Sequence, residues 1–329
     1  KVNSAFALQI LHSSDNESSF QDPNTLEPKV LNYASVTQCL EEVAAQEGIP
    51  SIHVTAGDHT LPGPFYQAAA EADSKPGLAD IGIFNALGLT ANGMGNHEFD
   101  GGIDEFATML EYANYPFLAV NLDFSNVQLQ DGTPAIEIGV DGGSVVENAG
   151  KVAKSAYVEV GGEKIGLIGR APAGFFNVIS DPATNHPGLD FVGGRDPETN
   201  QPLASAVGQV LEQVAILEAQ GINKILLLDH EQDFTGDPLS TEFLNGIDII
   251  VSAGSTGFMA GDRVEGPFNL LRPGDSGSAA YPTTRADADG NPVLVVNSEQ
   301  LYRYVGNLIV GFDAHGIVDF VDSRSGPVA

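Results

Sequence analysis

The stretch "ANGMGNHEFDGG", residues 91–102, places an Asn, a His, a Glu and an Asp in one tight turn that glycines flank on both sides. Glycine lets the backbone adopt conformations that a side chain would forbid, which suits a loop that presents polar groups at close quarters. An ordinary surface turn is also rich in Gly, Asn and Asp. The rest of the chain therefore has to decide between a turn and a site.

Apolar runs and helical patterns alternate on both sides of this stretch. "SIHVTAGD" (51–58), "NKILLLDH" (223–230) and "IDIIVSAGST" (247–256) are predicted strands that end in polar residues, whereas "GIDEFATMLEYAN" (102–114) has helical spacing. This alternation predicts an α/β fold with a largely parallel sheet flanked by helices. Antiparallel strands are expected late in the chain, in a hairpin over 304–321.

Further turns and the domain count follow from the glycine and proline pattern. A second hairpin is predicted over 152–170, with its turn at Gly161-Gly162. "DADGN" (287–291) resembles a calcium loop but lacks the downstream Glu, so a hairpin turn is the better interpretation. Strand–helix units continue beyond the two loose stretches, 125–150 and 177–202. Residues 1–329 are therefore predicted to form a single domain.

Composition limits the classes of function. The formal net charge is −30 and the sequence pI is about 4.2, which argues against nucleic acid as a partner, because nothing would offset phosphate repulsion. No apolar run is long enough to span a membrane, and no signal-peptide pattern begins the chain. The single cysteine, Cys39, excludes an internal disulfide and is expected to be a small buried side chain in a helix over 33–48.

Polar side chains follow five of the predicted strands. In open α/β sheets, ligands bind at the carboxyl ends of the parallel strands, so these side chains are expected to gather at one edge. In chain order they are Asp15, Asn16 and Glu17; Asp58 and His59; Asn96, His97, Glu98 and Asp100; Asp229 and His230; and Ser252, Ser255 and Thr256. Carboxylates and imidazoles converging from separate strands favour a metal site over coincidence. Mixed oxygen and nitrogen donors suit Mn, Mg, Ca, Fe or Zn.

A site of this kind suggests hydrolysis. Two cations a few ångströms apart can bridge a water, lower its pKa and hold the oxygens of a phosphoryl group. A neighbouring histidine that binds no metal can protonate the leaving oxygen.

Three motifs carry a resemblance to a known family. "ILHSSD" (10–15), "VTAGD" (54–58) and "GNHEFD" (95–100), in this order, resemble the calcineurin-like metallophosphoesterases, and within them the 5′-nucleotidase branch and the secreted bacterial phosphatases. "LLLDH" (226–230) and "IDIIVSAGST" (247–256) extend the match along nearly the whole chain. The resemblance implies a four-layer α-β-β-α sandwich of two facing mixed sheets with helices outside, and a two-metal site at the sheet edge.

The resemblance also implies roles for single residues. Asp15, Asp58, Asn96 and His230 match metal-ligand positions, with Asp58 as the bridge between two ions. His97 matches the catalytic histidine that binds no metal. By the same analogy, Asp100 orients the imidazole of His97.

The chain departs from the family pattern at three ligand positions. The first motif normally reads Asp-x-His, and here it is Asp15-Asn16-Glu17; the last normally reads Gly-His-x-His, and here it is Gly254-Ser255-Thr256. Glu17 can still ligate through oxygen, and Thr256 can do so weakly. A related group of bacterial phosphatases shows similar replacements, which favours a modified site. Fewer nitrogen donors shift the expected preference from Zn towards Mn, Ca or Mg.

One hypothesis divides these ligands between two cation sites. The first, with Asp15, Glu17 and Asp58, is oxygen-rich and complete, and the second, with Asp58, Asn96 and His230, is weakened. The leading function is a secreted, periplasmic or cell-surface phosphomonoesterase that acts on nucleotides or other small phosphate esters through a metal-bridging hydroxide, with His97 assisting. The C-terminal nucleotide-binding domain of the 5′-nucleotidases is expected to be absent. Two alternatives remain open: a weakly active or inactive metal-binding or adhesive module, and a phosphodiesterase or nuclease on the same scaffold.

Overall fold

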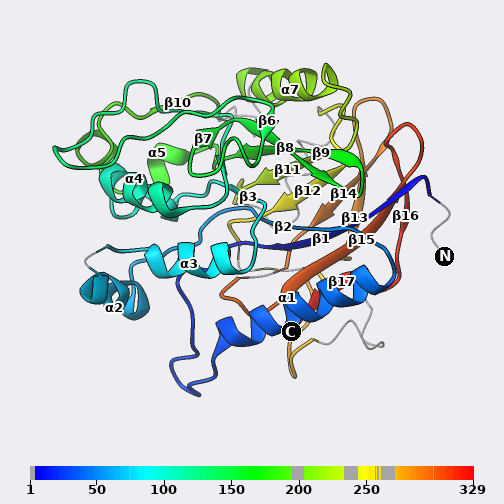
Figure 1. Cartoon of the computed structure of the whole chain (residues 1–329), viewed down its shortest axis with the longest axis horizontal. Helices are drawn as coiled ribbons and strands as arrows, with labels where there is room; N and C mark the ends of the chain where they lie inside the picture. The colour runs from blue at the N-terminus through cyan, green and yellow to red at the C-terminus, as the bar shows by residue number, and fades with distance from the viewer. Residues whose placement is uncertain are drawn as a thin grey trace.

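Two mixed β-sheets pack face to face, and helices cover both outer surfaces, so the chain forms four layers (Figure 1). The structure is a computed structural model that describes residues 4–73, 75–194, 204–232, 244–255, 257, 259–260, 271–298 and 300–329. This architecture confirms the expected α-β-β-α sandwich. The single parallel sheet suggested by alternation alone is replaced by two sheets, each with parallel strands in the middle and antiparallel additions.

The first sheet has the strand order β16-β15-β1-β2-β3-β4-β7, and β17 also pairs with β15. The pairs from β1 through to β7 are parallel, whereas β15 is antiparallel to β1, β16 and β17. The bounds are β1 Phe6–Ser13, β2 Ser51–Thr55, β3 Ala91–Gly93, β4 Phe117–Leu118, β7 Val152–Ala153, β15 Val305–Phe312, β16 Val318–Val321 and β17 Gly326–Val328.

The second sheet has the order β13-β14-β12-β11-β9-β8-β6, with β9, β11, β12 and β14 parallel. A separate two-stranded sheet joins β5 and β10. The bounds are β5 Leu122–Asp123, β6 Gly143–Ser144, β8 Ser155–Val160, β9 Glu163–Arg170, β10 Asp190–Phe191, β11 Ile225–Asp229, β12 Ile249–Ser252, β13 Thr283–Ala286 and β14 Pro292–Val296.

Helices close the two outer faces. α1 packs on β1, β2 and β15 of the first sheet, and α7 packs on β9 of the second, where it buries Val210, Val214 and Leu217 (Figure 1). The helices are α1 Lys29–Gln46, α2 Pro64–Asp73, α3 Leu78–Ala86, α4 Ile103–Tyr112, α5 Phe175–Val178, α6 Pro182–Asn185 and α7 Ala204–Glu218, with a 3₁₀ turn, η1, at His97–Phe99.

The two sheets approach each other closely where β3 and β4 meet β11 and β9. Ile10, Leu118 and Leu227 are fully buried in the layer between them. A Cβ on Gly93 would lie 3.0 Å from the carbonyl oxygen of Leu228, and one on Gly169 would overlap the backbone of Leu118. The missing side chains at these two glycines therefore let the ends of strands from both sheets converge on one edge.

Several local predictions need correction. Cys39 is exposed, not buried, because the inner face of α1 is formed by Tyr33, Thr37, Leu40 and Ala44, and Cys39 lies off that face. Residues 155–170 form the predicted hairpin, but Val152–Ala153 pairs with β4 in the other sheet. The apolar run over 117–124 forms two short strands, β4 and β5. The hairpin over 304–321 and the turn at 287–291 are confirmed.

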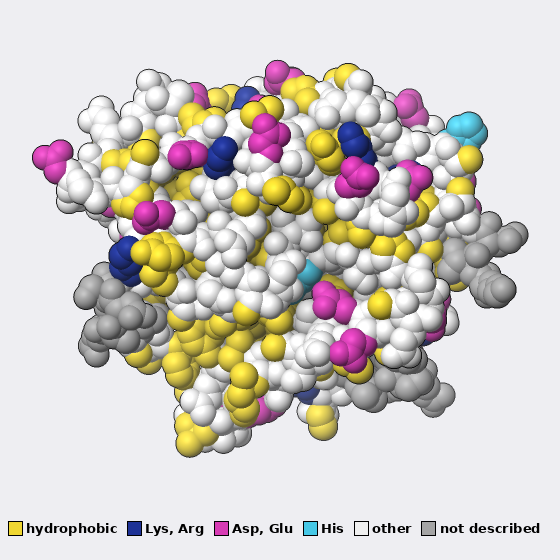
Figure 2. Space-filling view, viewed as in Figure 1, with side chains coloured by type: hydrophobic (Ala, Val, Ile, Leu, Met, Phe, Trp, Pro, Cys, Tyr) yellow, Lys and Arg dark blue, Asp and Glu magenta, His cyan; other side chains and the backbone are white. Residues whose placement is uncertain are grey.

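The surface reflects the acidic composition. Acidic side chains outnumber basic ones on the face seen in Figure 2, and a histidine lies beside acidic side chains near its middle. Within the described ranges, none of the helices combines the length and the apolar character needed to cross a membrane.

Candidate metal centre

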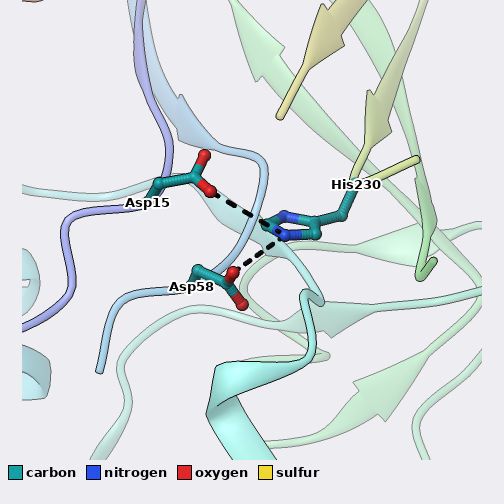
Figure 3. Close-up of side chains that lie close together, drawn as sticks. All are labelled: Asp15, Asp58 and His230. Atoms are coloured by element: carbon teal, nitrogen blue, oxygen red, sulfur yellow. Dashed lines mark ion pairs between the residues drawn. The ribbon is translucent and has the colours of Figure 1, made fainter. Parts of the chain in front are cut away.

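Three buried side chains from three strand ends meet at the edge where the sheets converge. Asp15 follows β1, Asp58 follows β2 and His230 follows β11, and their ligand atoms all lie within 4.8 Å of one another (Figure 3). The exposed fractions are 4% for Asp15, 2% for Asp58 and 0% for His230. The structure thus brings together three of the predicted ligand residues from distant parts of the chain.

The imidazole of His230 is oriented by the backbone. Its Nδ1 lies 2.6 Å from the carbonyl oxygen of Ala56, and because a carbonyl can only accept, Nδ1 carries a hydrogen. The other nitrogen, Nε2, lies 2.9 Å from Oδ2 of Asp58 and 4.0 Å from Oδ1 of Asp15. Nε2 therefore faces two carboxylates, and either a proton or a cation has to stand between them.

The charges of the cluster agree with this conclusion. Burial would lower the pKa of His230, but the charges of Asp58 and Asp15 raise it to about 10. Burial raises the pKa of Asp15 above its usual range. A divalent cation would replace the proton on Nε2 and satisfy two carboxylates and one imidazole, a donor set that hard and borderline metals accept. The residues therefore fit a metal ion.

The loops that carry the carboxylates have an unusual backbone. The φ values of Asp15, Glu17 and Asp58 are 50°, 53° and 57°, in the left-handed region that residues other than glycine rarely adopt. Backbone hydrogen bonds hold the two loops side by side, from the N–H of Asp15 to Gly57 and from the N–H of Glu17 to Asp58, at 2.9 and 3.0 Å. Strain of this kind persists where the surrounding structure imposes it, and it concentrates at functional sites.

Glu98 joins the loop after β2 to its own loop after β3, and no role was predicted for it from the sequence. Its Oε2 accepts hydrogen bonds from the N–H groups of Asp58 (3.1 Å) and Gly95 (2.9 Å), and its Oε1 accepts one from His59 (2.8 Å). The side chain is 2% exposed. Its position in the "GNHEFD" turn was visible in the sequence, but its partners are backbone groups that no sequence pattern marks.

His97 and Asp100 form a pair beside the cluster. Nδ1 of His97 lies 2.7 Å from Oδ2 of Asp100, and the backbone N–H of His97 donates to Oδ1 of Asp58 at 2.8 Å. Burial alone would lower the pKa of His97, but the hydrogen bond with Asp100 and the charge of Asp58 raise it to about 9. The side chain of His97 is 28% exposed, so the ring is partly accessible from solvent.

Asn96 is buried and bonded to the loop that follows β11. Its Oδ1 accepts a hydrogen bond of 2.8 Å from Nε2 of Gln232.

Glycines on both sides of the cluster leave no room for side chains: a Cβ on Gly95 would overlap Oδ1 of Asp58 and lie 2.8 Å from Cε1 of His230. The N–H of Gly254 donates to Oδ2 of Asp15 at 3.1 Å.

The remaining residues singled out in the sequence do not belong to the group of Asp15, Asp58 and His230 within the described part of the chain. Glu17 is outside the group of three among the residues described, although burial and the charges of Asp15 and Asp58 raise its pKa to about 7. Thr256 lies outside the described residues. His59 is not at the surface: it is buried, stacks on Phe84 and bonds to Thr55.

Arg170, the last residue of β9, binds a buried carboxylate next to His230. Its Nε and Nη2 form two hydrogen bonds, 2.8 and 2.7 Å long, with the buried carboxylate of Asp229. Asp229 is the last residue of β11 and directly precedes His230, so the pair with Arg170 holds the end of β11 in place.

Comparisons with known proteins agree with the fold. No family model matches the chain. A probable 5′-nucleotidase of Treponema pallidum is 28% identical over 327 residues, which cover 95% of this chain and 46% of that protein. The mouse 5′-nucleotidase is 26% identical over 334 residues, which cover 99% of this chain and 49% of the relative. The chain thus spans about half the length of these relatives.

Solved structures show the same architecture. A 5′-nucleotidase precursor of Thermus thermophilus has a TM-score of 0.72 and 25% identity, and the match covers 98% of this chain and 55% of that one. The calcineurin-like phosphoesterase YfkN of Bacillus subtilis has a TM-score of 0.64 and 17% identity, with 98% and 91% covered; it supports the fold alone.

The chain therefore shares its layered fold with solved structures of a 5′-nucleotidase precursor and of a calcineurin-like phosphoesterase. In sequence it resembles named 5′-nucleotidases over about half of their length, which corresponds to their N-terminal domain.

Proposed function

We propose that this chain is a metal-dependent phosphomonoesterase that acts on nucleotides or similar small phosphate esters. The observation that carries the proposal is the buried group of Asp15, Asp58 and His230, whose ligand atoms lie within 4.8 Å of one another beside His97. The named relatives are 5′-nucleotidases, which supports a nucleotide as the substrate. Residues 1–329 would form one catalytic domain, since the two large sheets share one core.

In this proposal Asp15, Asp58 and His230 bind a divalent cation, which we take to be Mn, Ca, Mg or Zn. When bound, the cation would act as a Lewis acid toward the phosphoryl group and the attacking water. Asp58 is the most central ligand, because its two oxygens face different partners, His230 and the N–H of His97. Asn96 and Glu17 would complete the coordination, and Thr256 is kept as a weaker candidate.

His97 would act on the leaving group. Its Nδ1 is held by Asp100, so Nε2 is directed to a substrate and can donate a proton to the departing oxygen. The raised pKa of His97, about 9, means that the ring is protonated at neutral pH, as a proton donor requires. Asp100 would act by orienting the ring and stabilising its charge.

We also propose that the protein works outside the cytoplasm, as a secreted, periplasmic or cell-surface protein. The Thermus relative is named a precursor, and another relative is a snake venom enzyme. The acidic surface is compatible with a small ester as substrate and disfavours long nucleic acids.

The test is hydrolysis of a chromogenic phosphomonoester and of adenosine 5′-monophosphate by the metal-free chain, with Mn, Ca, Mg or Zn added in turn. We expect turnover with at least one metal and none with a chelator. His97→Ala should lower kcat about 10²- to 10⁴-fold at unchanged metal content. Asp100→Asn should lower it about 10- to 100-fold.

Two outcomes would contradict this function. Turnover no higher than that of His97→Ala with every metal would indicate an inactive metal-binding module. Faster hydrolysis of a matched phosphodiester than of the monoester would indicate a diesterase.

A further inference from the structure

The amide of Gln232 lies beside the group of Asp15, Asp58 and His230, and no role was predicted for it from the sequence. Gln232 follows His230 by two positions and has a φ of 65°, in the left-handed region that residues other than glycine rarely adopt. Its Nε2 donates to Oδ1 of Asn96 at 2.8 Å. The oxygen of Asn96 that would bind a cation therefore already has a partner.

Gln232 also fills the space where a side chain on Gly254 would stand. A Cβ built on Gly254 would lie 2.7 Å from Cα of Gln232 and 3.0 Å from its Cδ. Gly254 itself contacts the cluster through the hydrogen bond from its N–H to Asp15. Gln232 thus lies against Gly254 on the loop after β12 and bonds to Asn96, although it is exposed to solvent, and it leaves no room for a side chain at position 254.

The charge of the group of Asp15, Asp58 and His230 also favours one tightly bound cation over two. Asp15 and Asp58 together carry two negative charges, which one divalent cation neutralises. The buried carboxylate of Glu98 already accepts hydrogen bonds from three backbone N–H groups. A second cation would have to approach Asn96 against the partial positive charge of the Gln232 amide and against the first cation.

We infer that Gln232 controls a second cation position: the cluster binds one divalent cation tightly, and a second one binds next to Asp58 and Asn96 only when the Gln232 side chain turns away. The inference rests on the proposed metal-dependent function, and it names the residue that sets the number of ions. Without the Gln232 amide, Oδ1 of Asn96 would be free to act as a ligand.

The experiment is calorimetric titration of the metal-free chain with MnCl₂, together with electron paramagnetic resonance spectra, which distinguish isolated from paired Mn²⁺. The natural chain should bind the first Mn²⁺ at least about tenfold more tightly than the second, and substoichiometric Mn²⁺ should give the spectrum of an isolated ion. In Gln232→Ala the affinity for the second Mn²⁺ should rise about 5- to 10-fold, the effect of removing one competing hydrogen bond. Paired-ion signals should then appear at lower Mn²⁺.

Two further variants make the test selective. Gln220→Ala is the control, because the Gln220 amide also donates hydrogen bonds, to the carbonyl oxygens of Gly142 and Ile216, and this variant should bind metal like the natural chain. Gln232→Glu keeps the shape but replaces the amide by a carboxylate, so it should strengthen the second site at least as much as the alanine variant does. It also tests the idea if Gln232→Ala fails to fold.

The outcomes are separable. Equal affinity for two Mn²⁺ in the natural chain would overturn this inference and leave the proposed function intact. Weaker second binding in Gln232→Ala would also overturn it, because Gln232 would then be a ligand. No Mn²⁺ binding at all would overturn the proposed function, and this inference with it.

Discussion

Asp58 shows how much one side chain contributes to this site. Its Oδ2 faces Nε2 of His230 and its Oδ1 accepts the backbone N–H of His97, while its own N–H donates to Glu98. The carboxylate was predicted as a ligand from its place after an apolar strand. Its left-handed backbone, with a φ of 57°, was not predicted, because it results from contacts with loops distant in the sequence.

Gly95 gives a sharp test of this packing. Gly95→Ala should displace Asp58 and His230, since the new Cβ would overlap Oδ1 of Asp58, and the variant should lose most of its bound metal and unfold at lower temperature. Metal content by elemental analysis and thermal unfolding measure the two effects. Gly208→Ala is the control: a Cβ there meets nothing within 4 Å in α7, so it should stabilise the helix by about 0.5–1 kcal/mol. Normal metal content in Gly95→Ala would contradict the described geometry.

Asp80 is a buried acid whose protonation should make stability depend on pH. It is 0% exposed, accepts a hydrogen bond from Ser18 at 2.8 Å, and burial raises its pKa to about 8. The folded pKa is above the unfolded value, so protonation favours the folded state, and this contribution is lost as the pH rises from about 4 to about 8. Asp80→Asn should therefore be more stable than the natural chain at pH 7.5, by on the order of 2 kcal/mol, and nearly equal to it at pH 4.

Urea unfolding at the two pH values measures this difference. Asp131→Asn, at an exposed position, is the control, and its free energy of unfolding should equal that of the natural chain at both pH values. A stability gain in Asp80→Asn that is the same at both pH values would show that the raised pKa is not its cause.

The loops after β2 and β3 act as one unit because side chains of each bond the backbone of the other. Asn92 accepts hydrogen bonds from Thr55 and from the N–H of Gly57, and Glu98 accepts those of Asp58 and His59. The strands themselves were predicted from apolar runs, since their pattern is local. The hydrogen bonds between the two loops were not predicted, because they depend on the parallel pairing of β2 with β3.

Removing the Glu98 carboxylate should disconnect these loops. Glu98→Ala leaves three buried N–H groups without their acceptor, so we expect a loss of about 3 kcal/mol in the free energy of unfolding and a large drop in metal affinity. Glu98→Gln retains one acceptor oxygen, so its stability and metal affinity should lie between those of the natural chain and those of Glu98→Ala. Denaturant unfolding and metal titration measure both effects, and exposed Glu212→Ala in α7 is the control. Unchanged metal affinity in folded Glu98→Ala would exclude a positioning role.

The whole molecule carries a large excess of negative charge, and this should make its stability sensitive to salt. At a formal net charge of −30, like charges repel one another more in the compact state than in the unfolded chain. Raising NaCl from about 0.02 M to about 0.5 M should therefore raise the unfolding temperature at pH 7.5, because the Debye length shortens. The effect should nearly vanish near pH 4.2, the sequence pI. An equal salt effect at both pH values would indicate a cause other than charge.

Local order along the chain was readable from spacing alone. β1, α4, β11 and β15 lie where apolar periodicity predicted them, and the polar residues after the strands include all three members of the cluster. Short-range preferences of the backbone and the alternation of apolar side chains are enough for this. The motif resemblance added the four layers, which periodicity did not indicate.

Other features depended on contacts between distant segments. The division of the strands into two sheets, the exposure of Cys39 and the transfer of Val152–Ala153 to the first sheet follow from which surfaces pack together. The bonds of Glu98 and Gln232 depend on where loops far apart in the chain come to rest. A linear pattern records the side chains but not the backbone groups that they will meet, because those groups become neighbours only after the sheets have packed.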